Sequence, residues 1–169
     1  VQAWMLAQSN ATAKLLASID GRDALAARIA EVTAAAGDRI TNVMRLPGER
    51  YYYLKRMRGE RQFRLMLRDG LAGTERTLVD PEVESRAAGV PHAINYYKPS
   101  WDGRYVAFGL SAGGSEDATL HVLDLNSGER VGEAMPRVKQ GAIHWLADSR
   151  SFTVGQLQAL RPGQPETDT

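Results

Sequence analysis

A serine flanked by glycines is the pattern in this chain that could most readily do chemistry. Residues 109–113 read GLSAG, which matches G-x-S-x-G, the motif in which a serine on a sharp turn attacks a carbonyl carbon. Asp124 and His144 follow Ser111, so an acid and a base come in the order that this triad requires, and His121 is a further candidate base. A working nucleophile elbow also needs a strand before the serine and a helix after it.

The residues after Ser111 predict a strand instead of that helix. A turn at Gly114-Ser-Glu-Asp117 leads into ATLHVLDL, whose apolar residues alternate with period two. We therefore interpret Ser111 as part of a structural turn and regard the order of Ser111, Asp124 and His144 as coincidence. The prediction is that this chain contains no catalytic residue.

The other reactive residue types give little support for a metal or cofactor site. His92, His121 and His144 stand far apart in the sequence, without a pair at the spacing typical of metal ligands. The chain has no cysteine, which excludes a thiol nucleophile, a thiolate zinc site and a disulfide scaffold. No Walker loop or dinucleotide-binding glycine pattern is present. We expect no metal ligands, no cofactor-binding residues and no cofactor.

A basic stretch between residues 45 and 68 has two interpretations. With Tyr51, Tyr52 and Tyr53 interleaved, it could bind single-stranded nucleic acid. The alternative is a solvated strand face, which we favour because the whole chain is balanced, with 21 Lys+Arg against 20 Asp+Glu. The cations of this stretch are Arg45, Arg50, Lys55, Arg56, Arg58, Arg61, Arg64 and Arg68, against Glu49 and Glu60. We expect no nucleic-acid partner.

Length and composition are those of an ordinary globular protein. The 169 residues are 43% hydrophobic and 24% charged, which suggests about one domain. The longest apolar runs are far shorter than the roughly 18–20 residues that a membrane helix needs, so we expect no membrane partner. The compartment stays open between cytoplasm and periplasm. The chain starts with Val1 and ends in a polar, proline-containing tail, from which we expect a segment of a longer protein.

The hydrophobic period changes along the chain from that of helices to that of strands. Residues 2–19 and the stretch from Asp20, a plausible N-cap, to Gly37 predict two helices. From Tyr51 onward the period is two. YYYLKRM and QFRLMLRD predict a hairpin, RYVAFGLS and ATLHVLDL predict a second, and AIHWL and SRSFTVGQL begin a third. Residues 82–93 are expected to form a loop, and no useful helix is expected after residue 40.

A repeat accompanies the strands. The turn at Asp102-Gly-Arg104 and the turn at Asp148-Ser-Arg150 each precede an aromatic-rich strand, and Gly48-Glu-Arg50 is a weaker third copy. A period of about 40–50 residues with about four short strands is typical of a propeller blade. The sequence therefore predicts a mainly β fold with N-terminal α-helices: an incomplete β-propeller of about two and a half blades.

Four stretches of the chain share the features of one family. In chain order they are WMLAQSNATAKLL, YYYLKRMRGERQFRLMLRDGLAGTERTLVDP, WDGRYVAFGLSAGGSEDATLHVLDLNSGE and HWLADSRSFTVGQL. They resemble the N-terminal part of the prolyl oligopeptidases, serine peptidases that cleave short peptides after proline. The resemblance covers essentially the whole chain, with departures at Ser9, Glu82 and Val154.

The resemblance implies a domain organisation and a role. Residues 1–40 would form a helical segment that packs on a C-terminal α/β-hydrolase domain, and residues 41–169 would be part of a seven-bladed-type propeller. The blades would span about 41–90, 91–142 and 143–169, the third being incomplete. The Ser, Asp and His of the triad would lie in the hydrolase domain, outside these residues, so this segment alone is expected to be inactive.

Two hypotheses from different classes remain. The first is the access-restricting part of a serine oligopeptidase, with short proline-containing peptides and its own hydrolase domain as partners. The second is a non-catalytic β-propeller that binds peptides or proteins. Against the second stands the absence of the Gly-His and Trp-Asp signatures of common scaffold propellers, because Trp101-Asp102 opens a turn instead of ending a strand.

Overall fold

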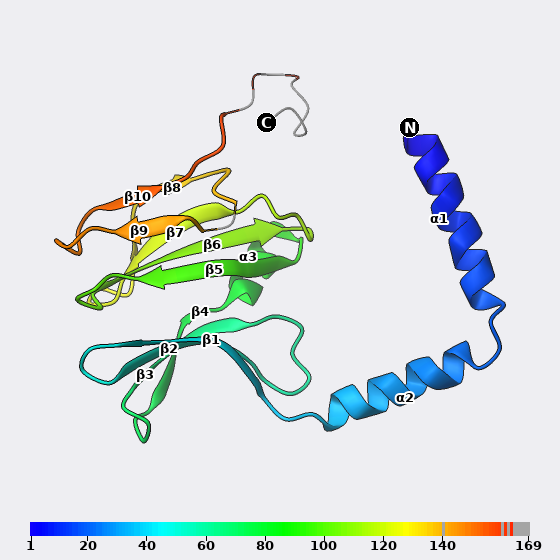
Figure 1. Cartoon of the computed structure of the whole chain (residues 1–169), viewed down its shortest axis with the longest axis horizontal. Helices are drawn as coiled ribbons and strands as arrows, with labels where there is room; N and C mark the ends of the chain where they lie inside the picture. Colours follow the sequence, from blue (N-terminus) through cyan, green and yellow to red (C-terminus); the bar gives the residue numbers. More distant parts are fainter. Residues whose placement is uncertain (140, 160, 162, 164–169) are drawn as a thin grey trace. The chain divides into compact units, whose positions relative to one another are not determined.

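The computed structural model describes residues 1–139, 141–159, 161 and 163 of the chain (Figure 1). The chain divides into two compact units, residues 1–37 and 38–169, which are treated separately below. Within the described residues, the first unit is helical and the second consists of antiparallel sheets with one short helix.

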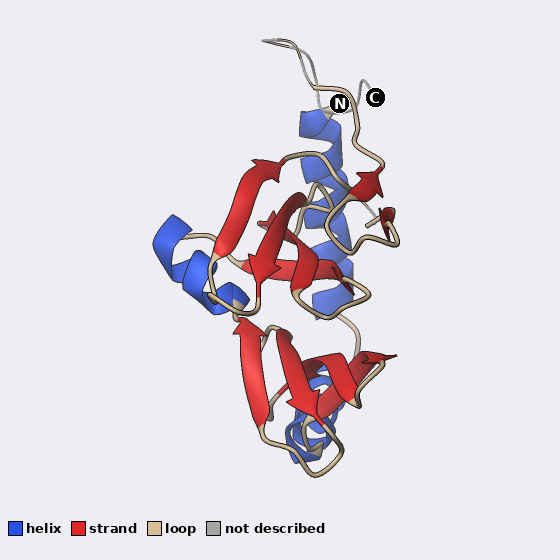
Figure 2. Cartoon of the chain, turned by 90° about the vertical axis from the view of Figure 1, so that its left-hand side faces the viewer, coloured by secondary structure: helices blue, strands red, loops and turns tan. Residues whose placement is uncertain are grey.

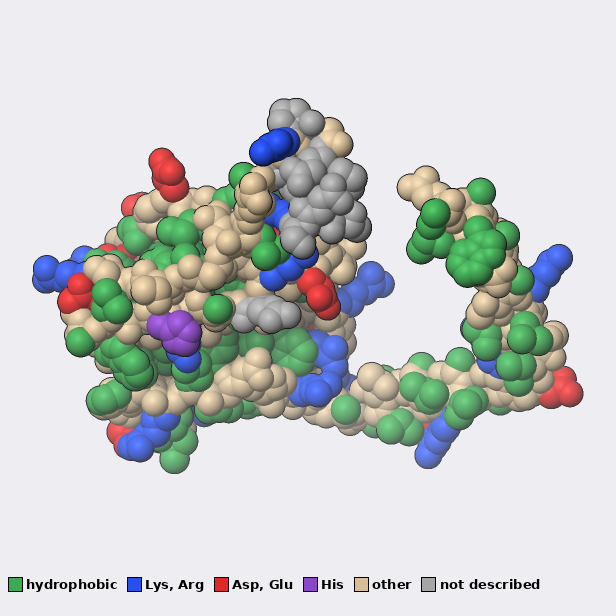
Figure 3. Space-filling model, turned by 45° about the horizontal axis from the view of Figure 1, so that its top comes forward, with side chains coloured by type: hydrophobic (Ala, Val, Ile, Leu, Met, Phe, Trp, Pro, Cys, Tyr) green, Lys and Arg blue, Asp and Glu red, His purple; other side chains and the backbone are tan. Residues whose placement is uncertain are grey.

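The N-terminal unit consists of two helices, α1 (Gln2–Ala17) and α2 (Arg22–Ala35). Neither helix has a buried residue, and apolar side chains gather along the unit (Figure 3). Trp4, for example, is 66% exposed. The expected N-cap at Asp20 is wrong: the N-cap of α2 is Gly21, which adopts a left-handed φ of 78° without a side-chain cap. Glycine reaches this conformation without the steric cost that Asp20 would meet.

The first sheet has the strand order β1-β2-β3-β4 and is antiparallel throughout. Its strands are β1 (Arg39–Leu46), β2 (Arg50–Arg56), β3 (Arg64–Asp69) and β4 (Glu75–Val79). The hairpin of β2 and β3 is the one expected from the period-two pattern. Strand β1 was not expected, because a register shift between Thr41 and Met44 breaks its alternation.

A short helix, α3 (Pro81–Ala88), follows the first sheet. The expectation of a loop over 82–93 and of no helix after residue 40 is therefore wrong. The local sequence contains the signals: the Asp80 side chain accepts a hydrogen bond from the Glu82 N–H, Pro81 occupies the first turn, and Gly89 ends the helix at a φ of 71°. Pro81 stops the strand and also starts the helix.

The second and third sheets continue the same pattern. The second has the order β5-β6-β7-β8, and β9 pairs with β10 in a separate two-stranded sheet. The strands are β5 (His92–Pro99), β6 (Tyr105–Ala112), β7 (Thr119–Asp124), β8 (Arg130–Met135), β9 (Ile143–Trp145) and β10 (Phe152–Val154). The hairpin patterns anticipated β6, β7, β9 and β10, whereas β5 and β8 were not expected.

Two apolar clusters hold the sheets of the second unit together. The first lies between the first and second sheets, which form separate layers (Figure 2), and includes the fully buried Tyr52, Leu65 and Phe108. The other joins the second and third sheets and includes Leu120 and Trp145. Among the described residues these sheets do not close a ring, and the expected fold class, mainly β with N-terminal helices and an incomplete propeller, is confirmed.

The repeated turns contact one another across the sheets. The Gly103 carbonyl accepts hydrogen bonds from Arg50 Nη1 at 3.0 Å and from the Tyr52 hydroxyl at 3.2 Å. The Asp102 N–H donates to Ser149 Oγ at 3.2 Å. Each copy of the turn motif is thus held by the preceding or the following copy, so the repeat carries contacts between sheets as well as local turns.

Gly103→Ala is expected to destabilise the second unit by about 1–3 kcal/mol. Gly103 has a φ of +68°, and a Cβ there would lie 2.8 Å from Arg50 Nη1 and 3.2 Å from the Tyr52 hydroxyl. Gly128→Ala is the matched control, because Gly128 has a φ of +76° but nothing within 4 Å of an added Cβ. Thermal unfolding of the two variants measures the difference, and equal losses would show that the contacts to Gly103 contribute nothing.

Candidate functional site

Ser111 lies inside a strand and does not form a nucleophile elbow. It is 4% exposed in β6 and pairs with Ala93 of β5. After Ala112 the chain turns through Gly113 and Gly114, both with positive φ, and continues into strand β7. The helix that would follow a catalytic serine is replaced by a strand, and the serine is covered.

The other two residues of the triad that the sequence order suggests, Asp124 and His144, lie on other strands. Asp124 pairs with Tyr105, six positions before Ser111 on β6, which separates the two by about 20 Å along the strand. Arg104 donates to the Asp124 carboxylate at 3.0 Å, and this bond together with the Asn126 N–H keeps the pKa of Asp124 below its usual value. Asp124 is therefore a turn-stabilising anion, and no triad forms with Ser111 and His144.

The three histidines belong to three different strands. His121 stacks on Phe108 with ring centroids 5.5 Å apart, and its burial lowers the pKa of His121, which favours the neutral ring. His92 Nδ1 lies 2.9 Å from the Val90 carbonyl, and His144 is on β9. Within the part of the chain that the structure describes, no three His, Asp or Glu side chains are grouped so that they could hold a metal ion.

The basic stretch forms ion pairs with carboxylates, most of which lie outside it in the sequence. Lys55 Nζ lies 2.8 Å from Glu75 and 3.2 Å from Asp38, and Arg68 lies 2.9 Å from Glu75. Further ion pairs join Arg64 to Asp80 and Glu60, Arg50 to Asp69, and Arg45 to Glu49. Phosphates would have to displace these carboxylates, so the arrangement disfavours a nucleic-acid surface.

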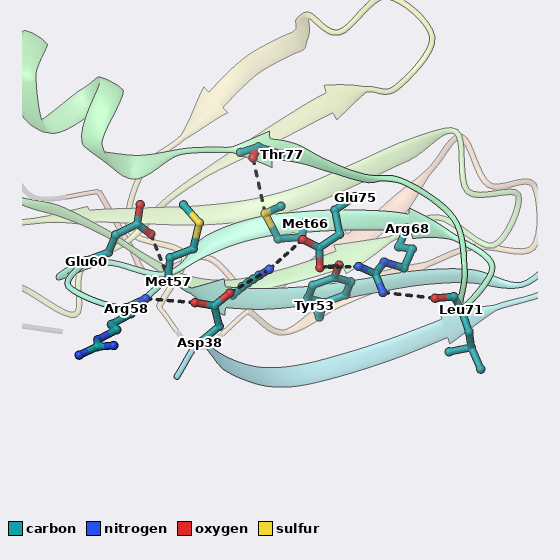
Figure 4. A network of polar contacts seen from close by, with 11 residues as sticks. Asp38, Tyr53, Met57, Arg58, Glu60, Met66, Arg68, Leu71, Glu75 and Thr77 are labelled. Atoms are coloured by element: carbon teal, nitrogen blue, oxygen red, sulfur yellow. Dashed lines mark hydrogen bonds and ion pairs between the residues drawn. The ribbon is translucent and has the colours of Figure 1, made fainter. Parts of the chain in front are cut away.

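Four side chains form a connected network of hydrogen bonds and ion pairs on one face of the first sheet. We call it the charged face and define it by Tyr53, Lys55, Arg68 and Glu75 (Figure 4). The Tyr53 hydroxyl donates to Glu75 at 2.6 Å, although Tyr53 is only 4% exposed. Burial and the neighbouring Glu75 carboxylate raise the pKa of Tyr53 to about 12. The hydrogen bonds from Lys55 and Tyr53 lower the pKa of Glu75, so at neutral pH Glu75 is ionised while the Tyr53 hydroxyl keeps its proton.

The network gives the first sheet a defined dependence on pH. Because its pKa is lowered on folding from an ordinary 4.5, Glu75 stabilises the sheet above about pH 4.5, and that contribution is lost as the pH falls through the lowered value. Glu75→Gln should remove this part of the acid dependence and cost stability at pH 7. Denaturant unfolding of the wild type and of Glu75→Gln between pH 7 and pH 3 tests this prediction. If the free energies of unfolding of the two proteins changed with pH in parallel, the prediction would be wrong.

A small apolar cavity lies where the first strands of the three sheets meet. It has a volume of about 210 Å³ and is lined by Met44, Leu46, Lys98, Pro99, Trp101, His144 and Trp145. Trp101 Nε1 donates to the Trp145 carbonyl and Trp145 Nε1 donates to the Lys98 carbonyl, both at 3.0 Å. These bonds fix both indole rings. Strands β1, β5 and β9 therefore lie next to one another, as the inner strands of propeller blades do.

Comparison with models of known protein families identifies this architecture. The model for the prolyl oligopeptidase N-terminal β-propeller domain matches residues 1–165. The chain belongs to the prolyl oligopeptidase family. Among the described residues, no helix is both long enough and apolar enough to cross a membrane.

Individual relatives agree with this assignment. One solved chain, from a study of two prolyl endopeptidases and the role of inter-domain dynamics in catalysis and specificity, is 33% identical, with a TM-score of 0.75 over 90% of this chain and 22% of that one. Prolyl oligopeptidase B from Galerina marginata, bound to a 35mer substrate, has the same fold, with 18% identity, a TM-score of 0.70 and coverage of 90% and 24%. An uncharacterized peptidase, y4sO, of Sinorhizobium fredii is 32% identical over 89 residues, 53% of this chain and 12% of that protein.

This prolyl oligopeptidase chain thus spans less than a quarter of the length of each of the two solved relatives described above. The homologues are peptidases in which a propeller is joined to a catalytic domain. What the sequence analysis missed in this segment is the charged face: Glu75 lies outside the basic stretch, and only the pairing of β2 with β3 and of β3 with β4 brings it to Lys55 and Arg68. Opposite charges on strands expected to pair were the signal that could have found it.

Proposed function

We propose that this chain is the N-terminal and propeller part of a serine oligopeptidase that cleaves short peptides after proline. The observation that carries the proposal is the match of the propeller-domain family model to residues 1–165. In this proposal the propeller restricts access to a chamber, and the catalytic Ser, Asp and His belong to an α/β-hydrolase domain outside these residues. The chemistry is acyl transfer: the serine attacks the carbonyl carbon of the proline residue, backbone N–H groups stabilise the oxyanion, the amine of the next residue leaves, and water then hydrolyses the acyl-enzyme.

The domain organisation is part of the proposal. Residues 1–40 would brace the hydrolase domain, and residues 41–169 would supply blades of about 41–90, 91–142 and 143–169. The separate sheets β1–β4, β5–β8 and β9–β10 support this division, although residues 140, 160, 162 and 164–169 lie outside the described part.

The helical unit supports the bracing role because its apolar side chains have no partner within the unit. A globular domain seldom leaves so many large apolar residues exposed on two short helices, so a larger body is expected to cover them. The residues concerned are Trp4, Met5, Leu6, Leu15, Leu16, Ile19, Leu25, Ile29 and Val32, each at least 43% exposed.

Hydrolysis by the full-length protein tests the proposal. We expect a short reporter peptide with proline before the scissile bond to be cleaved with a kcat/KM about 100-fold above that of its alanine counterpart. The same proline sequence placed inside a folded protein should not be cleaved, because the propeller excludes it. Binding of the peptide without hydrolysis would instead support the non-catalytic propeller, and cleavage of the folded protein would contradict the access role.

A further inference from the structure

The apolar cavity between β1, β5 and β9 is small and is built entirely by the described sheets. Its volume of about 210 Å³ is below the roughly 300–1,000 Å³ of pockets that enclose drug-sized ligands, so it suits one compact side chain. Its lining residues come from these three strands and from the turn that follows β5. The walls of the cavity therefore do not depend on the blades that a complete ring would add.

The strands around the cavity are the first strands of their sheets. Strands β1 and β5 each form one edge of a four-stranded sheet, and β9 pairs with β10 alone. They lie in successive layers of the second unit (Figure 1). The blades of a propeller surround a central channel, and the first strands that meet side by side line it. In the proposed propeller the cavity opens to this channel, where a short peptide can reach it.

One wall of the cavity is an indole ring that is exposed and yet fixed. Trp101 is 60% exposed, and its Nε1 donates to the Trp145 carbonyl at 3.0 Å. Trp145 is 7% exposed and is held in turn by its bond to the Lys98 carbonyl. A fixed aromatic surface loses little conformational entropy when a ligand packs on it, and grooves lined by aromatic rings are surfaces on which proline docks.

The polar side chains around the cavity favour an anion. The lining includes Lys98 and His144 but no Asp or Glu. Within the part of the chain that the structure describes, the Lys98 ammonium makes no hydrogen bond or ion pair. The carboxylates of the adjoining turns, Asp102 and Asp148, accept hydrogen bonds inside their own turns. Lys98 is therefore available to a carboxylate that comes from outside the chain.

A proline ring suits this cavity better than other residues do. The carbonyls of Lys98 and Trp145 already accept the two indole N–H groups. A residue with a backbone N–H would have to leave that donor without a partner against the apolar walls, at a cost in free energy. Proline has no such N–H, so its ring can be buried without this cost.

We propose that this cavity binds the C-terminal residue of a short peptide, with a proline ring against Trp101 and the α-carboxylate beside Lys98. Cleavage after proline releases a peptide that ends in such a prolyl carboxylate. The ligand is therefore the N-terminal product of the reaction, and this identification rests on the proposed function. The site holds released product within the channel of the propeller.

Calorimetric titration of the full-length protein with three synthetic peptides tests the proposal. The peptides are Ala-Ala-Pro with a free carboxylate, the C-terminal amide of the same peptide, and Ala-Ala-Ala with a free carboxylate. We expect a dissociation constant of about 0.1–1 mM for the first and about 10-fold weaker binding of each of the other two. The binding should persist after treatment with a fluorophosphonate, which blocks a catalytic serine.

Variants of the cavity separate its contribution from binding elsewhere. Lys98→Gln should weaken binding of the proline acid about 10-fold and leave that of the amide unchanged, so that the preference for the acid disappears. Trp101→Ala should weaken binding of both proline peptides about 10-fold. Lys139→Gln is the matched control, because it removes the same charge from a residue that does not line the cavity, and it should bind like the wild type.

The outcomes distinguish this proposal from the proposed function. A preference for the acid that survives in Lys98→Gln, an equal loss in Lys139→Gln, or binding abolished by the fluorophosphonate would each overturn the cavity as the binding site. Cleavage after proline together with any of these results would leave the proposed function standing. The expected dependence on Lys98 in a protein that cleaves no proline peptide would support the binding site and contradict the proposed function.

Discussion

Leu15→Asp in the full-length protein is expected to detach the N-terminal helical unit. Leu15 is 66% exposed in α1, and in the proposed organisation it packs on the hydrolase domain. Burial of a leucine side chain contributes about 1.5–3 kcal/mol, and an unpaired carboxylate in its place adds a desolvation cost. A loss of about 3 kcal/mol shifts the docking equilibrium about 100-fold. Amide hydrogen exchange of residues 2–17 should accelerate by that factor.

Asn10→Asp is the matched control for this experiment. At about 100° per residue, Asn10 lies about 120° around α1 from Trp4 and about 140° from Leu15, so it introduces the same charge away from these two apolar side chains. Its exchange rates should match those of the wild type. If Leu15→Asp exchanged no faster than Asn10→Asp, the side of α1 that carries Leu15 would not be a docking surface, and the role of residues 1–40 would have to be abandoned.

Phe108→Ala is expected to have the largest effect on the second unit. Phe108 is fully buried in the cluster between the first and second sheets, and its ring contacts His121. Truncation of a buried phenylalanine costs about 3–5 kcal/mol, because the lost transfer free energy is joined by the cost of a cavity. The free energy of unfolding of the propeller part, measured in denaturant, should fall by that amount.

Leu71→Ala provides the comparison, since Leu71 is 74% exposed in the turn between β3 and β4. Its effect should stay within about 0.5 kcal/mol. A similar small loss for Phe108→Ala would mean that the first and second sheets do not depend on their shared apolar cluster.

The sequence predicted the strands whose alternation is regular and missed those whose alternation is interrupted. The β2–β3 hairpin was expected because the second of its two segments alternates: Phe63, Leu65 and Leu67 share one face, and Arg64, Met66 and Arg68 share the other. Strand β1 was missed because of its register shift between Thr41 and Met44, and β5 has a similar shift between Ile94 and Tyr96. Such irregularities shift which side chains face the core, so a period-two pattern cannot find the strand.

Helix α3 was missed for a different reason. Its start signals, Asp80 and Pro81, are also the signals that end a strand, and eight residues are too few to establish a helical period. The charged face was out of reach because it depends on pairing between strands: Lys55 and Glu75 are close only after β2, β3 and β4 have assembled. The motif GLSAG shows the reverse case, since local sequence suggested a site that the β6–β7 hairpin rules out.

In the proposed function, this segment shapes access to a serine peptidase whose chemistry lies outside it. Labelling the full-length protein with a serine-directed fluorophosphonate, followed by mass spectrometry of the labelled peptide, tests that claim most directly. We expect a single labelled serine beyond residue 169, the same label in a Ser111→Ala variant, and no label on residues 1–169 expressed alone. A label on Ser111, or a full-length protein that takes up no label, would contradict it.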